Sequence, residues 1–229
     1  TTELMILLEK IVLHNSDFAK YKKLQNLLII TAIKSDQSRV MDYINRLDNY
    51  DAVQIAQIAM DPRYNLFEEA FTIYKKQNMH SEALDILIQN IGDLHRAEDY
   101  AEKVNQPEVW SKLGVTYLNN VKVTNAMDAF MKCKDHTYYL RVIGLMDNEQ
   151  ESEEKDFKYP LYIKYLLMVR EATKDVNIDN SLTFSYARLD KLTELESFLS
   201  GTNSADCQKV GDKCFNAGLY EAAKKFYTI

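Results

Sequence analysis

Apolar residues recur at helical spacing along most of the chain, and short polar clusters interrupt them. One such stretch reads RVMDYINRLDNYDA, residues 39–52. Its apolar positions fall at i, i+3, i+4 and i+7, which places their side chains on one stripe of an α-helix: Val40, Tyr43, Ile44 and Leu47. After the polar cluster 48–51 a second stripe follows, with Ile55, Ile58 and Ala59. The pattern predicts two antiparallel helices joined by a tight corner.

The residues of this corner predict how each helix ends and begins. Asn49 is a candidate for the left-handed residue that follows the first helix, because Asn tolerates that conformation. Asp51, followed three residues later by Gln54, is typical of a capping box, in which the carboxylate accepts a backbone N–H and the amide reaches back. Asp51 is therefore expected to have a structural role at the start of the second helix.

An alanine followed four residues later by another packing residue recurs along the chain. These alanines are Ala70, Ala83, Ala97, Ala126 and Ala222, and the residues at i+4 are Tyr74, Leu87, Ala101, Phe130 and Phe226. A small residue at such a position lets a neighbouring helix approach closely. Ala97 and Ala126 stand 29 residues apart, close to the length of one helix pair. The recurrence predicts an all-α fold, a right-handed α-solenoid of stacked antiparallel helix hairpins with about fourteen helices.

Composition agrees with this fold and limits the function. Only 6 Gly and 3 Pro occur among 229 residues, so few residues are suited to the turns of β-hairpins. The formal net charge of −6 argues against nucleic acid as a partner, because phosphate binding requires a basic face. No apolar run approaches the ~20 residues of a transmembrane helix. No signal peptide is recognisable either, so any membrane role is expected to be indirect.

Catalytic and metal-binding patterns are not recognisable, so the chain is expected to be neither an enzyme nor a cofactor-binding protein. The four histidines (His14, His80, His95 and His136) are scattered, and HExxH, GxSxG and Gly-rich phosphate-loop motifs do not occur. Cys133, Cys207 and Cys214 include no CxxC pair. Cys207 and Cys214 are seven residues apart, so they are expected to be small side chains on one buried face, which fits a reducing, cytoplasmic compartment. A catalytic group assembled from distant positions stays open as the alternative.

Several longer stretches resemble the leg of the clathrin heavy-chain family. They are LQNLLIITAIKSDQSRVMDYINRLDNYDA (24–52), LFEEAFTIYKK (66–76), HRAEDYAEKVNQPEVWSKL (95–113), LTELESFLSG (192–201) and VGDKCFNAGLYEAAKKFY (210–227). The resemblance covers nearly the whole chain, and the NRLDNYDA and NQPEVWSKL blocks are its most specific parts. The chain is most similar to the end of the distal leg and the bend into the proximal leg.

The resemblance implies a structural coat protein. The chain would form part of the rod-like leg of a three-legged particle, which polymerises into the lattice around coated pits and vesicles on the cytosolic face of the membrane. It would lack the amino-terminal propeller and the carboxy-terminal trimerisation helix. Other heavy chains are the implied partners, the light chain would bind mainly beyond this segment, and adaptors would connect the coat to the membrane. One heavy-chain repeat would end at residue 75, the next would span 76–220, and 221–229 would begin a third.

The chain departs from the family's pattern in two places. The turn at residues 61–65 looks longer than the family's turn, and NEQESEEKDFKYP, residues 148–160, stands where the family usually has a tryptophan-containing helix start. Because Pro is tolerated at the first helical position, an enlarged loop and a helix that begins at Pro160 are expected. A second function also stays open, since a helical-repeat adaptor or tethering subunit of vesicle traffic would have the same periodicity.

Two further expectations concern single residues. The charged residues Arg39, Asp42, Arg46 and Asp48 should project from the polar faces and the corner, where they are either solvated or in contact with a neighbouring leg. Solvation is the simpler alternative, because exposed ion pairs contribute little. Trp110 follows Pro107 at a helix start and shares a stripe with Leu113 and Tyr117. This tryptophan is therefore expected to be buried between hairpins.

Overall fold

The chain is all-α in the part that the structure, a computed structural model, describes: residues 2–14, 18–148 and 155–228. Helix accounts for well over two-thirds of these residues and no strand occurs among them, so the predicted fold class is confirmed. The described residues contain fifteen α-helices, one more than the apolar pattern predicts. The chain divides into two compact units, residues 1–104 and residues 105–229.

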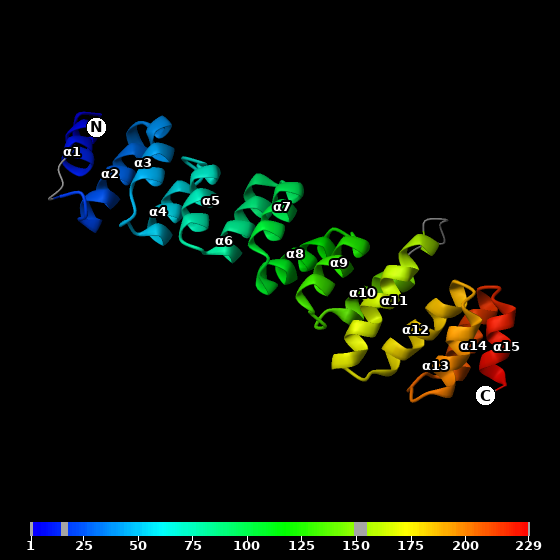
Figure 1. Cartoon of the computed structure of the whole chain (residues 1–229). Helices are drawn as coiled ribbons and strands as arrows, with labels where there is room; N and C mark the ends of the chain where they lie inside the picture. Colours follow the sequence, from blue (N-terminus) through cyan, green and yellow to red (C-terminus); the bar gives the residue numbers. More distant parts are fainter. Residues whose placement is uncertain (1, 15–17, 149–154, 229) are drawn as a thin grey trace. The chain divides into compact units, whose positions relative to one another are not determined.

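Residues 1–104 form consecutive helices that pack side by side (Figure 1). Helix α1 packs on α2, α4 on α5 and α5 on α6, while α2 also contacts α4 and α3 contacts α5. Each pair is thereby stacked on the next, which is the arrangement of an α-solenoid. The helices are α1 (Thr2–His14), α2 (Lys22–Ser35), α3 (Val40–Arg46), α4 (Ala52–Ala59), α5 (Phe67–Lys76), α6 (His80–Asp85) and α7 (Leu94–Val104), with a 3-10 turn at Gln37–Arg39 and a π-helical turn at Ile86–Ile91.

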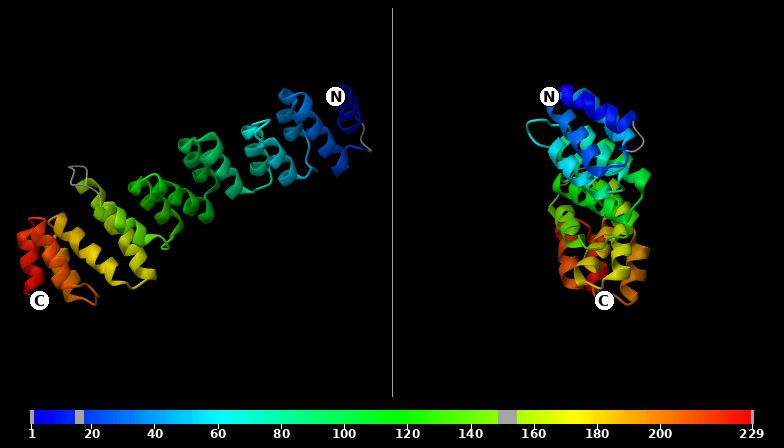
Figure 2. Two further views of the ribbon diagram at one scale, coloured as in Figure 1. Left: turned by 180° about the vertical axis from the view of Figure 1, so that it is seen from behind. Right: turned by 90° about the vertical axis from the view of Figure 1, so that its left-hand side faces the viewer.

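Residues 105–229 repeat the same arrangement, and the further views in Figure 2 show the pairing from two other sides. Helix α8 packs on α9, α11 on α12 and α14 on α15, and the pairs are joined by contacts of α9 with α11 and of α12 with α14. The helices are α8 (Pro107–Asn119), α9 (Val123–Cys133), α10 (Tyr139–Asn148), α11 (Lys155–Ala172), α12 (Val176–Arg188), α13 (Leu192–Ser200), α14 (Cys207–Asn216) and α15 (Tyr220–Tyr227). No helix of the described residues has both the length and the apolar character needed to cross a bilayer.

Four corners, each with three residues between two helices, share one backbone turn, which also ends α9 at Lys134. In each, a residue with positive φ follows the helix, and the next residue donates its N–H to the carbonyl five positions earlier at 2.9 Å. The donor and acceptor residues are Met79 and Tyr74, Lys122 and Tyr117, Lys191 and Tyr186, and Leu219 and Cys214. This bond closes a Schellman motif, which satisfies a carbonyl at the helix end and reverses the chain at once. The left-handed residues are Asn78, Val121, Asp190 and Gly218, of which Val121 is β-branched and therefore strained.

The core lies between the stacked helices, and it contains the positions that the alanine spacing singles out. Ala70, Ala83, Ala97 and Ala126 are fully buried, and Ala222 is 3% exposed. Trp110 is 3% exposed; its Nε1 donates to Asn105 Oδ1 at 3.1 Å, and the Lys132 ammonium lies 4.1 Å from the centroid of its ring. Pro107 occupies the first turn of α8, so the local start of this helix is as predicted.

Two glycines of residues 105–229 face an aromatic side chain of the neighbouring helix. A Cβ added at Gly114 of α8 would lie 2.5 Å from Cε1 of Phe130 on α9, which is well inside van der Waals contact. A Cβ at Gly211 of α14 would lie 3.0 Å from Cε1 of Tyr227 on α15. Glycine is needed at position 114, because the Phe130 ring occupies the space of a side chain, whereas at position 211 the neighbouring side chains would have to shift by only a few tenths of an ångström.

The predicted start of the helix at Pro160 is wrong. Helix α11 begins at Lys155, so Pro160 lies inside the helix rather than at its first position. A proline in a helix interior removes one N–H···O=C bond. Here the lost bond would have ended on the carbonyl of residue 156, close to the start of α11. The packing of the helix outweighs this loss, since Tyr162, Tyr165 and Leu166 are all at most 2% exposed. Most of the predicted loop, residues 149–154, lies outside the described residues.

Candidate functional site

The four charged residues that were expected at a contact surface are all exposed, around α3 and the corner after it. Arg46 Nη1 lies 3.2 Å from Asp42 Oδ2, an ion pair one helical turn apart on α3. Arg39 Nη1 lies 2.8 Å from Glu9 Oε2 of α1. Each pair is formed within residues 1–104, so these charges are compatible with plain solvation and do not need a partner to satisfy them.

Asp48 has a more structural environment than the other three. Its Oδ1 lies 2.6 Å from Nζ of Lys76, the last residue of α5. The same ammonium donates to the carbonyl oxygens of Ile44 at 3.0 Å and Leu47 at 2.7 Å. A lysine that binds the last carbonyls of a helix satisfies acceptors that have no partner inside the helix. Lys76 therefore fixes the end of α3 to the end of α5, and Asp48 balances its charge.

The corner itself differs from the prediction in two details. Helix α3 ends at Arg46, and Leu47 after it is extended. Asn49 does not have a positive φ, so it is not the left-handed residue that the sequence predicts. Its Nδ2 instead donates to the Lys20 carbonyl at 2.7 Å. Asp51 does cap α4, since its Oδ1 accepts from the backbone N–H of Gln54 at 3.2 Å. The reciprocal half of the capping box is replaced, because Asp51 N–H donates to Asn26 Oδ1 at 2.7 Å.

Side-chain oxygens of α2 hold this loop in place. Gln25 Oε1 accepts from the Asn49 N–H at 2.9 Å, and Asn26 Oδ1 accepts from the Asp51 N–H. Gln25 is only 4% exposed, and its Nε2 donates to the Ala19 carbonyl at 2.6 Å. Gln25, Asn26 and the backbone N–H groups of Asn49 and Asp51 together are called the α2 clasp. It pairs backbone donors that the loop would otherwise leave without partners.

The same device recurs in residues 105–229. Asp179 Oδ2 accepts from the Ser204 N–H at 2.7 Å, and Asn180 Oδ1 accepts from the Asp206 N–H at 2.7 Å. Asp206 then caps α14 by accepting from the Lys209 N–H at 3.0 Å. We name this set the α12 clasp. It differs from the α2 clasp in one respect, since the buried acceptor is a carboxylate and is paired with Arg170, whose Nε lies 2.6 Å from Asp179 Oδ1.

The two clasps define an internal repeat that the sequence analysis missed. Asp179 and Asn180 stand 154 residues after Gln25 and Asn26, and Asp206 stands 155 residues after Asp51. The signal in the sequence is an Asn preceded by Gln or Asp, followed 25 or 26 residues later by an Asp that starts a helix. The period is that of several helix pairs, so it is not visible at the scale of one hairpin.

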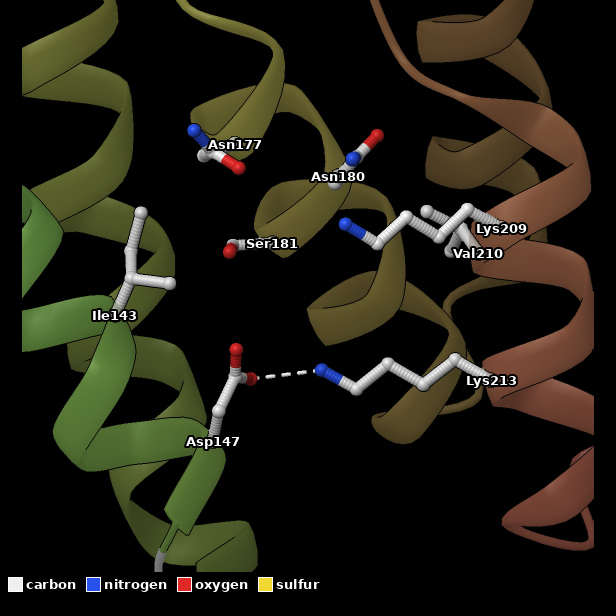
Figure 3. Close-up of a pocket in the computed structure, with 8 residues that line it drawn as sticks. All are labelled: Ile143, Asp147, Asn177, Asn180, Ser181, Lys209, Val210 and Lys213. Carbon is white, nitrogen blue, oxygen red and sulfur yellow. Dashed lines mark hydrogen bonds and ion pairs between the residues drawn. The ribbon is translucent and has the colours of Figure 1, made fainter.

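Figure 3 shows a small groove between α10, α12 and α14. Its volume is about 70 Å³, and Asn180 of the α12 clasp lines it. Lys213 Nζ lies 2.7 Å from Asp147 Oδ1 across the groove and 4.3 Å from the centroid of the Phe184 ring. The ion pair connects α10 to α14. Because the volume is that of a few water molecules, this groove is a packing contact.

Metal-ligating side chains and thiols are the groups considered for chemistry in the part of the chain that the structure describes. No set of three His, Cys, Asp or Glu side chains there could hold a metal ion. Cys133, Cys207 and Cys214 are free thiols. Cys214 is fully buried, as expected, whereas Cys207 is partly exposed. Burial raises the pKa of Cys214 to about 11, so this thiol stays protonated and a poor nucleophile at neutral pH.

Known proteins are similar in sequence to nearly the whole of this chain. The family described as "Region in Clathrin and VPS" matches residues 1–125 and 150–229. The chain is 47% identical over 226 residues to the "Clathrin heavy chain" of Dictyostelium discoideum. It is 46% identical over 227 residues to the "Probable clathrin heavy chain" of Schizosaccharomyces pombe and 43% identical over 225 residues to the "Clathrin heavy chain" of Drosophila melanogaster.

These alignments cover 98 or 99% of this chain but only 13% of each relative. The stacked helix pairs, the buried alanines and the repeated clasps agree with a repeat protein of this kind. From the extent of the family match and the identity along nearly its whole length, we conclude that the chain belongs to the clathrin heavy-chain family.

Proposed function

We propose that this chain is a structural segment of the rod-like leg of a clathrin heavy chain, and that the full-length protein self-assembles into the lattice around coated pits and vesicles. The observation that carries the proposal is identity of 43 to 47% with clathrin heavy chains along nearly the whole segment. Such a protein acts on the cytosolic face of the membrane, in intracellular transport and endocytosis. Within each unit, consecutive helix pairs stack on one another, which is the repeat arrangement from which an extended strut is built.

The proposal names the binding partners of the full-length protein and excludes an enzymatic role for this chain. Other heavy chains are the main partners, in the trimer and in the lattice. The light chain binds mainly beyond this segment, adaptors provide an indirect connection to the membrane, and nucleic acid is not a partner. The chain has no enzymatic role and needs no cofactor. A net charge of −6 supports the exclusion of nucleic acid. Burial raises the pKa of Cys214, which argues against this thiol as a catalytic nucleophile.

A helical-repeat adaptor or tethering subunit is the other function with this periodicity, and it is not favoured. The matching family covers VPS proteins as well as clathrin, so the repeat alone does not separate the two functions. The relatives described above are clathrin heavy chains by name, and their similarity extends to both ends of the segment.

Arg39, Asp42, Arg46 and Asp48 remain candidates for contact with a neighbouring leg. All four already form ion pairs within residues 1–104: Arg39 with Glu9, Asp42 with Arg46, and Asp48 with Lys76. We also propose that one heavy-chain repeat ends at residue 75, that 76–220 contains the next, and that 221–229 begins a third. The spacing of 154 or 155 residues between the two clasps supports a period of about this length.

Sedimentation of the isolated chain and of the full-length protein tests the proposal. Lattice contacts are individually weak, and multivalency supplies their strength. The 229-residue chain should therefore be monomeric or weakly self-associating at micromolar concentration, while the full-length heavy chain should form large assemblies. A tight dimer of the isolated chain would favour the adaptor function instead.

A further inference from the structure

A groove in residues 1–104 is lined by α5 and α7, and by His80 and Leu87 from the segment that joins them. Its volume is about 440 Å³. The Phe71 and Tyr100 rings meet edge to face in it, with centroids 5.3 Å apart, and the Tyr100 hydroxyl lies 2.7 Å from His80 Nδ1. The groove is therefore partly aromatic, its walls are held by internal contacts, and its size is within the range of ligand sites.

The charges that face each other across this groove differ between its two ends. Glu68 of α5 accepts from both Nη atoms of Arg96 on α7, at 2.6 and 2.9 Å. The aromatic contact of the two helices comes one turn later, so both helices advance in the same direction from the ion pair. Seven residues after that pair, or about two helical turns, the two helices carry Lys75 and Lys103. The register that places an acid opposite a base at one end therefore places two bases at the other end.

These two lysines lack an acidic partner. Both line the groove and are exposed, and neither forms an ion pair with any residue that the structure describes. Asp99, the acidic residue that lines the groove, lies 3.5 Å from His95 Nδ1 on its own helix. Two ammonium groups that face one groove repel each other, whereas an anion between them interacts favourably with both. The charge of this end of the groove thus points to an anionic ligand, although the chain as a whole carries a net charge of −6.

The other lining groups indicate which kind of anion fits. Arg96 is already engaged by Glu68, so the bidentate guanidinium contact that favours a phosphate group is occupied. The remaining cations are two ammonium groups on different helices, which suit two separate carboxylates. Phe71, Leu87 and Val104 add apolar surface, which suits an aromatic side chain between the carboxylates. An acidic peptide segment with one aromatic residue supplies both kinds of group.

We propose that the groove of residues 71–104 binds an acidic segment of another protein, with an aromatic side chain against Phe71 and Leu87 and with carboxylates at Lys75 and Lys103. This inference goes beyond the proposed function, because the partner is an accessory protein that binds along the leg and not a second heavy chain. One aromatic residue and a few carboxylates bury little area, so each contact is weak and depends on the many copies of the site in a coat. The exposed ammonium groups make the contact sensitive to salt.

Fluorescence anisotropy with designed peptides tests the site. The first probe is a labelled heptapeptide that has a central phenylalanine and glutamate at every other position. Two matched probes replace the phenylalanine by alanine, or all the glutamates by lysine. We expect the 229-residue chain to bind the first probe with a Kd on the order of 100 µM at low salt. It should bind each matched probe at least about tenfold more weakly, because one lacks the anchor and the other has the wrong charge.

Matched variants of the chain locate the binding site. Lys75→Glu and Lys103→Glu should each weaken binding of the first probe at least about tenfold. Either change places opposite charges across the groove, so neither should lower the Tm. Lys23→Glu makes the same charge change at an exposed position of α2 outside the groove and should leave binding within about twofold of the unsubstituted chain. The double variant at 75 and 103 should instead prefer the lysine probe, because the charges of both partners are then reversed.

Several results would overturn the proposal. They are no binding of the first probe by the unsubstituted chain, equal binding by the three single variants, and equal binding of the phenylalanine and alanine probes. Sedimentation tests a second copy as the occupant: self-association of the chain that Lys75→Glu abolishes would assign the groove to a heavy-chain contact and also overturn the proposal. None of the peptide measurements depends on lattice assembly, so their failure leaves the proposed function standing.

Discussion

Replacing Asp179 by Ala tests how strongly a clasp holds the solenoid together. Asp179 is 4% exposed, and its carboxylate accepts from Arg170 Nε at 2.6 Å and from the Ser204 N–H at 2.7 Å. The Ala side chain removes both acceptors at once. Hydrogen bonds that involve a charged group contribute about 1.5–3 kcal/mol each, so the two together set an upper limit of about 6 kcal/mol.

Part of this loss is recovered in the variant. The side chain of Arg170 is 31% exposed, so water can reach it. It also keeps its bond to the Thr202 carbonyl at 2.7 Å and its position 4.8 Å from the centroid of the Phe198 ring. We therefore expect Asp179→Ala to lower the free energy of unfolding by about 2–4 kcal/mol. Asp179→Asn keeps one oxygen acceptor and should lose about half as much.

Urea denaturation of the 229-residue chain, followed by circular dichroism, measures the change. The control is Glu171→Ala, which removes an exposed carboxylate from the same helix as Arg170 and should change stability by less than about 0.5 kcal/mol. Hydrogen exchange of the Ser204 amide should speed up in the Asp179 variant. An Asp179→Ala chain as stable as the Glu171→Ala chain would refute the claim that the α12 clasp holds the loop.

Three other predictions concern single corners and faces. Val121→Asn should stabilise the chain by about 1 kcal/mol, because Val121 is held at a φ of 57° that Asn tolerates and Val does not. Gly218→Ala, at a φ of 75° with nothing within 4 Å of an added Cβ, should destabilise the chain by a similar amount. A lower Tm of Val121→Asn or a higher Tm of Gly218→Ala in thermal denaturation would contradict the reasoning. Trp110→Ala should cost about 3–5 kcal/mol, and a water-exposed fluorescence maximum of the native chain would contradict the burial on which this rests. Reversing the charge of Asp42 or of Arg46 in the full-length protein should leave folding normal; impaired, salt-sensitive assembly by light scattering indicates a leg contact, and unchanged assembly across a salt series indicates solvation alone.

The fold could be predicted from the sequence because its determinants are local. The stripe around Val40 and Ile44, the cap at Asp51 and the proline at the start of α8 each act within one or two helical turns. A pattern that acts over such short distances is visible in the order of residues. The same holds for the buried alanines, whose spacing fixes the face that they occupy.

The features that were missed depend on residues far apart in the sequence. Gly114 is needed because Phe130 faces it, and the Asn26 side chain matters because the loop at Asp51 reaches it. Pro160 was misplaced because its local preference for a helix start was outweighed by the packing of α11 along its whole length. Val121 adopts a left-handed conformation that its side chain disfavours, since the α8–α9 corner requires one there. Each of these outcomes depends on packing or on a corner geometry that the local preference of a single residue does not show.

Electron microscopy of the purified full-length heavy chain, alone and under assembly conditions, tests the central claim most directly. A clathrin heavy chain should appear as a three-legged particle with extended legs, and it should form closed lattices when assembly is induced. Single elongated molecules that never trimerise or polymerise, and that instead bind partner proteins one to one, would contradict the claim that this chain is a segment of a self-assembling coat.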